Sequence, residues 1–406
     1  MEESEIILVT IHGDDRPGVT AALTEILAHH DAFILDIGQA DIHKNLSLGI
    51  LFKAENSGEI MKDLLFKAYE LNVTVRFSPI TNERYTNWVS MQGKNRYIIT
   101  LLGRVLTAKQ IAAVSRIVTD QGLNIDNMIR LTGRIPLEEN MRSAKSCVEL
   151  SVRGTPKDKS QMQGEFLKLT SELELDISFQ EESMFRRMRR LICFDMDSTL
   201  IQTEVIDELA IKAEIGDQVK EITESAMRGE IDFNESFERR VALLKGLDVS
   251  VMRDIAENLP YTEGLERLMK VLKRIGFKTA ILSGGFTYFG NYLKEKFGFD
   301  YMYANELEVE NGKLTGKYVG DVVDGKRKAE LLRLISQVEK IDIRQTVAVG
   351  DGANDLPMLA TAGLGIAFHA KPKVKENAQQ SLSTVGIDGI LYFLGYKDSM
   401  IDNFLL

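Results

Sequence analysis

The stretch Leu191-Ile-Cys-Phe-Asp-Met-Asp-Ser-Thr199 decides the fold of this chain. Its four apolar residues predict a short buried strand, which delivers two carboxylates, Asp195 and Asp197, at its end. Two carboxylates in one small volume repel each other, so a cation or a shared proton has to offset the repulsion. Such a pair suits a carboxylate nucleophile beside an acid–base carboxyl, working on a phosphate with a divalent metal. Taken alone, the motif also fits a helix N-cap or a polar turn.

A second apolar run, Thr279–Leu282, ends at Ser283-Gly284-Gly285 and leads into a predicted helix at Phe286–Phe297. A hydroxyl and glycine N–H groups at a helix N-terminus form a cradle for an anion. A tight turn explains the same residues equally well, so this motif gains weight only from its neighbours.

A third run, Thr346–Val349, ends at Gly350-Asp-Gly-Ala-Asn-Asp355. Two carboxylates and an amide beside small residues suit a hard cation with oxygen ligands, Mg²⁺ in particular. A cation between Asp195 and Asp351 would also offset the repulsion within the first motif. The alternative is a solvated turn rich in Asp, Asn and Gly.

These three strands alternate with helices predicted at Gly264–Ile275, Phe286–Phe297 and Lys328–Val338. The alternation is typical of an α/β fold with a parallel sheet and crossover helices. Ligands of such sheets bind beyond the carboxyl ends of the strands, where all three polar clusters lie. The segment between the first two strands, about 201–258, is too long for a simple crossover and is a candidate helical lid.

A phosphate site surrounded by aspartates needs a positive partner, and two lysines stand near the start of the helix after Asp324. Lys326 and Lys328 both qualify. Most lysines in such a place are only solvated. We expect Lys328, which precedes Ala-Glu-Leu-Leu, to be the one that points inward.

The first half of the chain has the pattern of two copies of one α+β unit. A strand at Ile6–Thr10 and a helix at Val19–His29 correspond to a strand at Tyr97–Leu102 and a helix at Ala108–Asp120. The remaining predicted elements are strands at Phe33–Leu35, Leu48–Phe52, Val73–Val75, Asn124–Ile129, Cys147–Val152 and Leu175–Phe179, and helices at Ile60–Tyr69 and Lys159–Ser171. The expected organisation is domains at 1–82 and 95–180 joined by a polar linker at 81–94, a second linker at 181–190, and a domain at 191–406.

Composition excludes several classes of protein. The 406 residues are 44% hydrophobic and 27% charged, as in a soluble globular protein. The net charge of −10 argues against a nucleic-acid partner, and the basic cluster Arg186–Arg190 is better explained as a solvated linker or an inter-domain contact. The only cysteines are Cys147 and Cys193, no apolar run could span a membrane, and the acidic start lacks a signal sequence. We therefore expect a cytoplasmic protein without a membrane partner.

Asp195-Met-Asp-Ser-Thr199, Ser283-Gly-Gly285, Lys328 and Gly350-Asp-Gly-Ala-Asn-Asp355, in this order and at these strand ends, resemble the motifs of the haloacid dehalogenase (HAD) phosphatase superfamily. The resemblance covers about 191–394 and implies a HAD-like Rossmannoid parallel sheet with a helical cap. The serine after the second acid, together with the last motif, looks like the phosphoserine phosphatase branch of that superfamily.

The resemblance implies a mechanism and a metal. Asp195 would attack phosphorus to form an aspartyl-phosphate, and Asp197 would protonate the leaving oxygen and later activate water. Mg²⁺ would be held by Asp195, the backbone carbonyl of Asp197, Asp351 and Asp355, the last directly or through water. The groups implied to bind or orient the phosphate are Ser283, the Gly284 N–H, Lys328 and Asn354.

The insert also matches the cap of that branch. By the resemblance, Glu204 holds the ammonium of the substrate phosphoserine and Arg240 holds its carboxylate. A zwitterionic amino acid needs one anion and one bidentate cation, so the assignment makes chemical sense. Met227 and Phe233 would close an apolar lid. Taken one at a time, Glu204 and Arg240 could equally be residues of surface ion pairs. Met227 and Phe233 could equally belong to the core of the cap.

The two copies resemble ACT domains, α+β modules of βαββαβ (ferredoxin-like) fold that often bind amino acids at subunit interfaces. Asp15-Arg-Pro-Gly18 begins a helix whose N-terminus could receive a carboxylate, but the second copy lacks this motif. Asn124 stands where the family often has a ligand-binding Asn, and the first copy has Phe33 there. Two alternatives stay open. One is a composite regulatory site, with Asp15 and Gly18 from one module and Asn124 from another. The other is that the modules have lost amino-acid binding. The resemblance implies a homodimer and makes serine a candidate effector.

The function implied is Mg²⁺-dependent hydrolysis of phosphoserine to serine and phosphate, the last step of serine biosynthesis. Two alternatives stay open. One is a HAD phosphomonoesterase or phosphotransferase of other specificity, and the other is an amino-acid-sensing regulatory protein whose catalytic half only assists binding. The complete set of four motifs counts against the regulatory protein.

Overall fold

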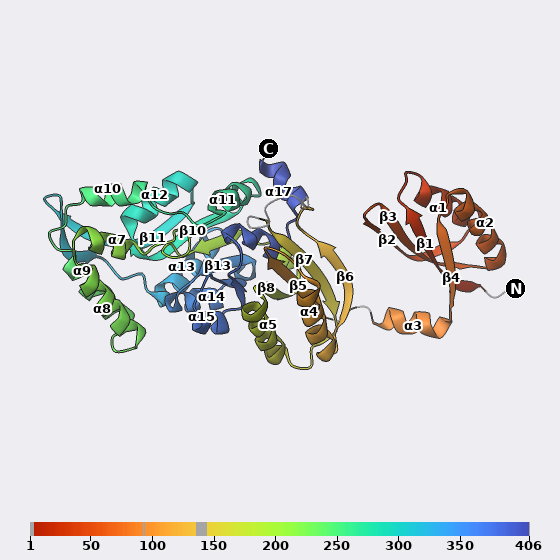
Figure 1. Cartoon of the computed structure of the whole chain (residues 1–406), viewed down its shortest axis with the longest axis horizontal. Coiled ribbons are helices and arrows are strands. Elements are labelled where there is room, and N and C mark those ends of the chain that lie inside the picture. The colour runs from red at the N-terminus through yellow and green to blue at the C-terminus, as the bar shows by residue number, and fades with distance from the viewer. Residues whose placement is uncertain (1–3, 92, 94, 135–143, 406) are drawn as a thin grey trace. The chain divides into compact units, whose positions relative to one another are not determined.

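The computed structural model describes residues 4–91, 93, 95–134 and 144–405, apart from the side chains of Met227 and of residues 403–405 (Figure 1). The chain divides into two compact units, Met1–Lys94 and Asn95–Leu406. Within the described residues, no helix combines the length and the apolar composition that crossing a bilayer requires.

The first unit is an antiparallel sheet with two helices packed on one face. Its elements are β1 (Glu5–Asp14), α1 (Val19–His29), β2 (Phe33–Ile42), β3 (Asn45–Ala54), α2 (Ser57–Glu70) and β4 (Thr74–Ile80). The strand order is β2-β3-β1-β4. Side chains at every second position of β3 are buried, and they form one core with Leu23 of α1 and Leu64 of α2. This is the βαββαβ order that the sequence predicts.

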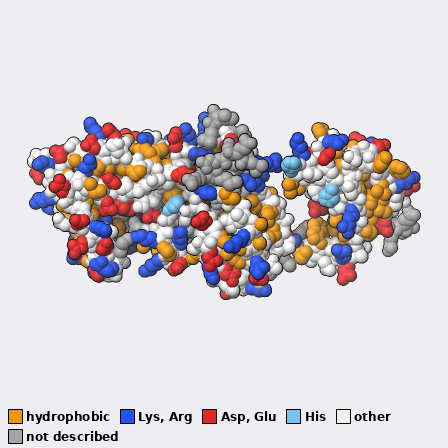
Figure 2. All heavy atoms as spheres, viewed as in Figure 1, with side chains coloured by type: hydrophobic (Ala, Val, Ile, Leu, Met, Phe, Trp, Pro, Cys, Tyr) orange, Lys and Arg blue, Asp and Glu red, His pale blue; other side chains and the backbone are white. Residues whose placement is uncertain are grey.

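Apolar side chains remain on the surface of this unit, where Figure 2 shows them gathered. The edge strand β2 is exposed at nearly every position, and its Phe33 and Ile42 are 67% and 76% exposed. Phe66 and Tyr69 of α2 are exposed as well. Large apolar patches of this kind are typical of protein–protein contact surfaces.

The predicted linker 81–94 contains a helix, α3 (Asn82–Ser90). The Thr81 hydroxyl accepts a hydrogen bond from the backbone N–H of Arg84, which is an ordinary N-cap. No residue of α3 is buried. Tyr85, Trp88 and Val89 stand at helical spacing, but they lie among polar residues and are not buried, so the segment was interpreted as a polar linker.

The second unit begins with the second copy of the same fold. Its elements are β5 (Arg96–Gly103), α4 (Ala108–Asp120), β6 (Asn124–Arg130), β7 (Ser146–Arg153), α5 (Lys159–Leu173) and β8 (Asp176–Glu181). The strand order, β6-β7-β5-β8, repeats that of the first sheet. A capping box of Thr107 and Gln110 starts α4 at the predicted residue. The predicted duplication is therefore confirmed.

After the short α6 (Met184–Arg187), the chain forms a sheet of order β12-β11-β10-β9-β13-β14-β15. The strands are parallel except for β12. Ile192 and Phe194 of β9 pack into one apolar cluster and Leu191 and Cys193 into another, because both faces of the sheet are covered. The strands are β9 (Leu191–Phe194), β10 (Lys278–Phe286), β11 (Tyr301–Glu310), β12 (Lys313–Val319), β13 (Thr346–Gly350), β14 (Leu364–Phe368) and β15 (Gln380–Leu382).

Helices cover both faces of this sheet, and four more fill the insert after β9 (Figure 1). The covering helices are α11 (Leu265–Arg274), α12 (Thr287–Phe297), α13 (Gly325–Val338), α14 (Leu356–Thr361), α15 (Pro372–Asn377), α16 (Ile390–Phe393) and α17 (Asp398–Leu405). Those of the insert are α7 (Val205–Lys212), α8 (Gly216–Met227), α9 (Phe233–Leu243) and α10 (Ser250–Glu257).

The sequence prediction contained only β9, β10 and β13 of these seven strands, so β14 and β15 were missed, and two further features differ. β10 continues through Ser283–Gly285 to Phe286, and its register against β11 shifts between Leu282 and Phe286. The glycines therefore lie in a strand irregularity, and the predicted helix follows it as α12, which begins at Thr287 instead of Phe286. The hairpin β11–β12 was not predicted, although Asn311 and Gly312, both at positive φ, form the kind of two-residue turn that signals one.

The second repeat is joined to the seven-stranded sheet by hydrogen bonds between β8 and the region of β15. The side-chain amide of Gln380 donates to the carbonyl of Phe179 and accepts from its N–H, both at 2.9 Å. The Asp176 carboxylate accepts from the N–H groups of Ser383 and Thr384, both at 2.7 Å. These side chains complete the backbone pairing of two strand edges, so the second repeat and the sheet form one body.

The basic cluster Arg186–Arg190 belongs to this interface. Arg186 pairs with Glu149 at 2.6 Å, and Arg189 donates to the Gln180 side chain at 3.0 Å. Both arginines are buried. Of the two alternatives left open by the sequence, the inter-domain contact therefore holds for these two residues, and the solvated linker does not.

Candidate active site

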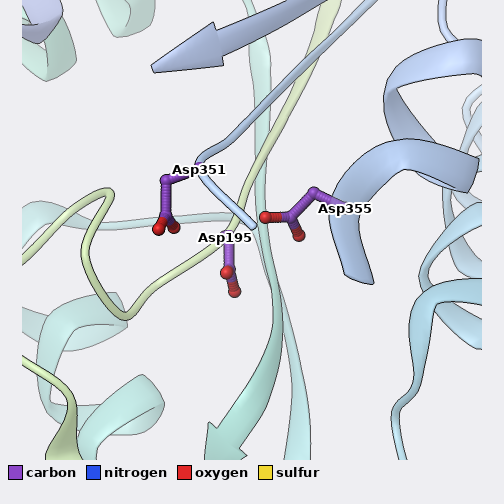
Figure 3. Close-up of side chains that lie close together, drawn as sticks. All are labelled: Asp195, Asp351 and Asp355. Carbon is purple, nitrogen blue, oxygen red and sulfur yellow. The ribbon is translucent and has the colours of Figure 1, made fainter. Parts of the chain in front are cut away.

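The polar clusters after β9 and β13 meet at one edge of the sheet. Asp195 and Asp351 directly follow these two neighbouring strands. One carboxylate oxygen each from Asp195, Asp351 and Asp355 lies within 4.8 Å of the others (Figure 3). Asp355 ends a short 3-10 turn, and its second oxygen accepts the Gly352 N–H at 2.9 Å. Parallel strand pairing thus brings three carboxylates from two distant segments into one cluster.

Lys328 lies inside this cluster. Its Nζ donates to Asp195 at 2.8 Å and to Asp355 at 2.7 Å, and the side chain is fully buried. Burial alone would lower the pKa of this lysine, but the two carboxylates outweigh burial and raise it above its ordinary value. Lys328 therefore stays charged. Lys326, the other lysine considered, is exposed to solvent.

One ammonium does not offset three buried carboxylates. Burial, followed by the charge of Asp355, raises the pKa of Asp195 well above its ordinary value. Burial, followed by Asp355 and Glu204, raises the pKa of Asp351 to about 7. These raised values measure an excess of negative charge that a cation would relieve. Carboxylate oxygens are the ligands that Mg²⁺ prefers, so the cluster fits a magnesium ion.

The second acid of the first motif has a different environment. Asp197 accepts a hydrogen bond at 3.1 Å from the N–H of Val205, at the start of α7. Its other oxygen lies so close to Gly285 that a Cβ there would come within 2.4 Å. Burial, followed by the charges of Glu204 and Asp195, raises the pKa of Asp197 well above its ordinary value. Its surroundings therefore favour the protonated carboxyl. The pKa of Asp195 is raised as well, and the hydrogen bond from Lys328 is what favours its ionised form.

The strand irregularity Ser283–Gly285 lies between the two acids and the cap. The Ser283 hydroxyl accepts a hydrogen bond from the Gly285 N–H at 2.9 Å. A Cβ on Gly284 would lie 3.0 Å from the ring of Phe233 and 3.8 Å from the Asn354 amide nitrogen. The glycine thus lets the cap helix α9 and the turn after β13 approach the same backbone atoms.

Glu204 and Arg240, two predicted substrate-binding residues of the insert, interact through their opposite charges. Glu204 accepts a hydrogen bond at 2.8 Å from the hydroxyl of Ser198, which has a left-handed backbone conformation. Burial lowers the pKa of Arg240, while the charges of Glu204 and Asp207 oppose that effect. Met227 is the last residue of α8, and its side chain lies outside the described residues.

The residues proposed for a regulatory site lie apart in the chain. Asp15 is exposed, and Gly18, at φ 96°, is the N-cap of α1 in the first unit. Asn124 begins β6 in the second unit, where its amide donates to Asp126 at 2.8 Å.

Three residues with a clear place in the site were missed by the sequence analysis. The Thr199 hydroxyl donates to Asp351 at 3.2 Å, and its carbonyl accepts from the Thr262 hydroxyl at 2.7 Å. Asn305 of β11 donates to the Gly284 carbonyl. Thr199 stood inside the quoted motif, but nothing in the pattern around Thr262 or Asn305 marks them, because their partners lie far away in sequence.

Comparison with known proteins agrees with this geometry. A family model of haloacid dehalogenase-like hydrolases matches residues 192–360, and two ACT-domain models match residues 5–78 and 96–180. The fold and the acidic site are therefore those of a haloacid dehalogenase-like hydrolase that carries two ACT domains.

Two relatives match nearly the whole chain. The phosphoserine phosphatase SerB2 of Mycobacterium tuberculosis is 39% identical over 98% of this chain and 94% of its own length. A phosphoserine phosphatase of Streptomyces coelicolor is 38% identical over 96% and 92%. The unliganded crystal structure of a probable phosphoserine phosphatase from Vibrio cholerae, 35% identical, covers 73% of this chain and 86% of its own, with a TM-score of 0.57. The chain belongs to the phosphoserine phosphatase family.

Proposed function

We propose that this chain hydrolyses O-phosphoserine to serine and phosphate, the last step of serine biosynthesis, with Mg²⁺ and an aspartyl-phosphate on Asp195. The observation that carries the proposal is the buried contact of Lys328 with Asp195 and Asp355 beside Asp351. A nucleophilic carboxylate, a fixed ammonium and an oxygen-ligand cluster are the parts that phosphoryl transfer needs.

In the first step, an oxygen of Asp195 attacks phosphorus while the bond between phosphorus and the serine oxygen breaks. Asp197 gives its proton to that oxygen, so serine leaves as the neutral alcohol. The raised pKa of Asp197 supports its role as the acid. Lys328, the Ser283 hydroxyl and the Gly284 N–H stabilise the charge on the transferring oxygens.

In the second step, Asp197, now a carboxylate, takes a proton from a water molecule. That water attacks phosphorus, the acyl-phosphate bond breaks, and Asp195 is regenerated as phosphate leaves. Asn354, close to Gly284, orients the phosphoryl group. Phe233 and Met227 of the cap, about residues 201–258, exclude bulk water during the first step and must admit water for the second.

The ligands of Mg²⁺ would be Asp195, Asp351, Asp355 and the backbone carbonyl of Asp197. When bound, Mg²⁺ would neutralise the acidic cluster and draw negative charge from the phosphoryl oxygens. The close carboxylates of the cluster and the raised pKa of Asp351 support this assignment.

Specificity for phosphoserine would come from Glu204, which receives the substrate ammonium, and Arg240, which receives its carboxylate. Once the zwitterion lies between them, Glu204 faces its ammonium and Arg240 faces its carboxylate, so each buried charge has an opposite charge beside it. Replacing Arg240 by alanine should therefore raise KM for phosphoserine at least tenfold more than KM for p-nitrophenyl phosphate, which has no carboxylate. Arg239→Ala is the matched control, since Arg239 is exposed and pairs with Glu235 on the outer side of α9.

The deciding experiment is a panel of phosphomonoesters assayed with Mg²⁺ and with a chelator, for the native chain and for Asp195→Asn. We expect phosphoserine to be the best substrate, turnover to need the metal, and the Asn variant to be folded and inactive. Turnover by Asp195→Asn would rule out the covalent mechanism, and a better substrate without an amino-acid end would rule out the assigned specificity.

The two ACT domains, residues 1–82 and 95–180, would serve dimerisation and a response to serine in a cytoplasmic enzyme. The exposed apolar side chains of β2 and α2 support a homodimer through the first unit. The candidate serine-binding residues are Asp15 and Gly18 of the first ACT domain and Asn124 of the second, and a loss of binding is the alternative. Light scattering of the whole chain, and of a chain lacking residues 1–94, tests the dimer, and turnover with added serine tests the effector.

A further inference from the structure

A buried asparagine joins two segments of the active site that are far apart in sequence. Asn305 lies on β11 and is 2% exposed. Its amide nitrogen donates to the Gly284 carbonyl at 2.8 Å, and its amide oxygen accepts from the Val323 N–H at 2.8 Å. Both ends of the carboxamide are therefore used, one on the strand irregularity and one on the loop before α13.

The contact with Gly284 replaces a missing ladder bond. β10 and β11 are in register up to Leu282 and again at Phe286, which stands opposite Asn305. Between these points the register of the two backbones is interrupted, and a buried carbonyl left without a hydrogen bond there would be costly. The Asn305 side chain supplies the hydrogen bond and so fixes the irregular conformation.

Fixing that carbonyl also aims the next N–H group. The peptide bond between Gly284 and Gly285 is planar and trans, so its C=O and N–H point in opposite directions. With the carbonyl held by Asn305, the Gly285 N–H points to the Ser283 hydroxyl at 2.9 Å. A Cβ on Gly285 would come within 2.4 Å of Asp197, so Gly285 and the Ser283 hydroxyl that its N–H orients lie beside the second acid.

The contact with Val323 acts on the lysine. Val323 precedes Asp324, whose side chain accepts the Arg327 N–H and whose carbonyl accepts the Lys328 N–H. The start of α13, and with it the direction of the Lys328 side chain, depends on where this loop is held. One carboxamide thus sets the distance between the Ser283–Gly285 segment and the lysine.

We propose that Asn305 is a positioning residue that holds the two anion-binding segments at the spacing a phosphoryl group requires. The proposal rests on the proposed function of the site, since the anion it positions for is the phosphate of the substrate and product. Asn305 need not touch the substrate; it acts through the Gly284–Gly285 peptide and through the first turn of α13.

A purely structural role would be served equally well by any buried carboxamide that satisfies two backbone groups, and the chain offers such a control. Gln380 is buried and makes the same pair of hydrogen bonds with the backbone of Phe179, at the interface with the second repeat. Asn305→Ala and Gln380→Ala each remove two such bonds. Their cost to stability should be comparable, whereas only Asn305→Ala should disturb phosphate binding.

The test compares these two variants with the native full-length chain in Mg²⁺. The readouts are the melting temperature, kcat and KM for phosphoserine, and the inhibition constant of inorganic phosphate. For Asn305→Ala we expect kcat/KM to fall at least tenfold and phosphate inhibition to weaken at least fivefold. For Gln380→Ala both should stay within twofold of the native chain.

Two results would overturn the proposal: unchanged phosphate inhibition and kcat/KM in Asn305→Ala, or an equal loss in Gln380→Ala. If Asn305→Ala does not fold, Asn305→Leu replaces it, because leucine fills a similar volume but can neither donate nor accept a hydrogen bond. The same losses are expected, and native behaviour of Asn305→Leu would count against the proposal. A native chain that neither hydrolyses phosphoserine nor responds to phosphate would instead refute the proposed function.

Discussion

Replacing Asp351 by asparagine should stabilise the metal-free protein. Asp351 is largely buried beside Asp355 and Glu204, and its pKa is raised to about 7 in the folded state from an ordinary value of 3.8. Asparagine has the same shape and can still accept the hydrogen bond from the Thr199 hydroxyl. The substitution therefore removes one buried charge and leaves the packing and the hydrogen bond in place.

The sign of the effect follows from proton binding. Below pH 3.8 the carboxyl is protonated in both states, and the substitution changes little. Between pH 3.8 and 7 the folded state holds the proton more tightly than the unfolded state, so the stability of the native chain falls as pH rises. The raised pKa of Asp351 lowers the free energy of unfolding, relative to its value at low pH, by about 2 kcal/mol at pH 5 and about 4 kcal/mol at pH 8. Both values are upper limits, because the surrounding structure relaxes around the charge.

The assay is the free energy of unfolding from urea titrations in a chelator, at pH 5 and at pH 8. Asp351→Asn should be more stable than the native chain at both values, with the larger gain at pH 8. Mg²⁺ should then raise the stability of the native chain by binding its folded state, and it should raise that of the variant far less.

Asp248→Asn is the control. Asp248 is exposed, and its hydrogen bonds with Ser250 lower its pKa, so its removal should bring no gain in stability at pH 8. If Asp351→Asn is no more stable than the native chain at pH 8 in chelator, or if its gain is the same at both pH values, then excess negative charge does not govern this cluster.

Three further predictions concern the site and the domains. Lys328→Met should lower kcat at least a hundredfold while the chain stays folded in Mg²⁺, as measured by steady-state kinetics. A smaller loss would show that the lysine does not stabilise the charge on the phosphoryl group. Gly285→Ala should abolish turnover, because its Cβ would meet Asp197 at 2.4 Å; an active variant would show that the bulge can shift. Deleting residues 1–94 should leave turnover and the melting temperature nearly unchanged. Deleting residues 1–180 should lower the melting temperature, because it removes the residues that hydrogen-bond to the β15 region. If both truncated chains have the same melting temperature and turnover, the second repeat is not part of the catalytic body.

Local periodicity accounts for what could be predicted from the sequence. Helices Val19–His29 and Ala108–Asp120 were predicted at their observed bounds because their buried positions recur with the helical period. Strand Leu191–Phe194 was predicted at its bounds because it is a continuous apolar run, buried on both faces. The acidic cluster could be predicted because parallel strand ends meet at one edge. The polar helix Asn82–Ser90 could not, since nothing in it is buried.

Contacts between distant segments account for the rest. Asn305 contacts Gly284 only because β11 lies beside the irregular part of β10, and no sequence pattern around Asn305 predicts that contact. The same holds for Gln380 and Asp176, which join the second repeat to the sheet across about 200 residues. The sequence could place the chemistry at the strand ends, but not the side chains that hold those ends at a fixed distance.

The charges of the cluster also set the order in which its ligands can bind. With Asp195, Asp351 and Asp355 ionised, the single ammonium of Lys328 leaves two negative charges in a buried space. A phosphate dianion entering that space would meet repulsion in a medium that screens it poorly. A divalent cation held by Asp195, Asp351 and Asp355 would offset this excess. Lys328, which pairs with Asp195 and Asp355 in this structure, would then be available to the phosphate oxygens.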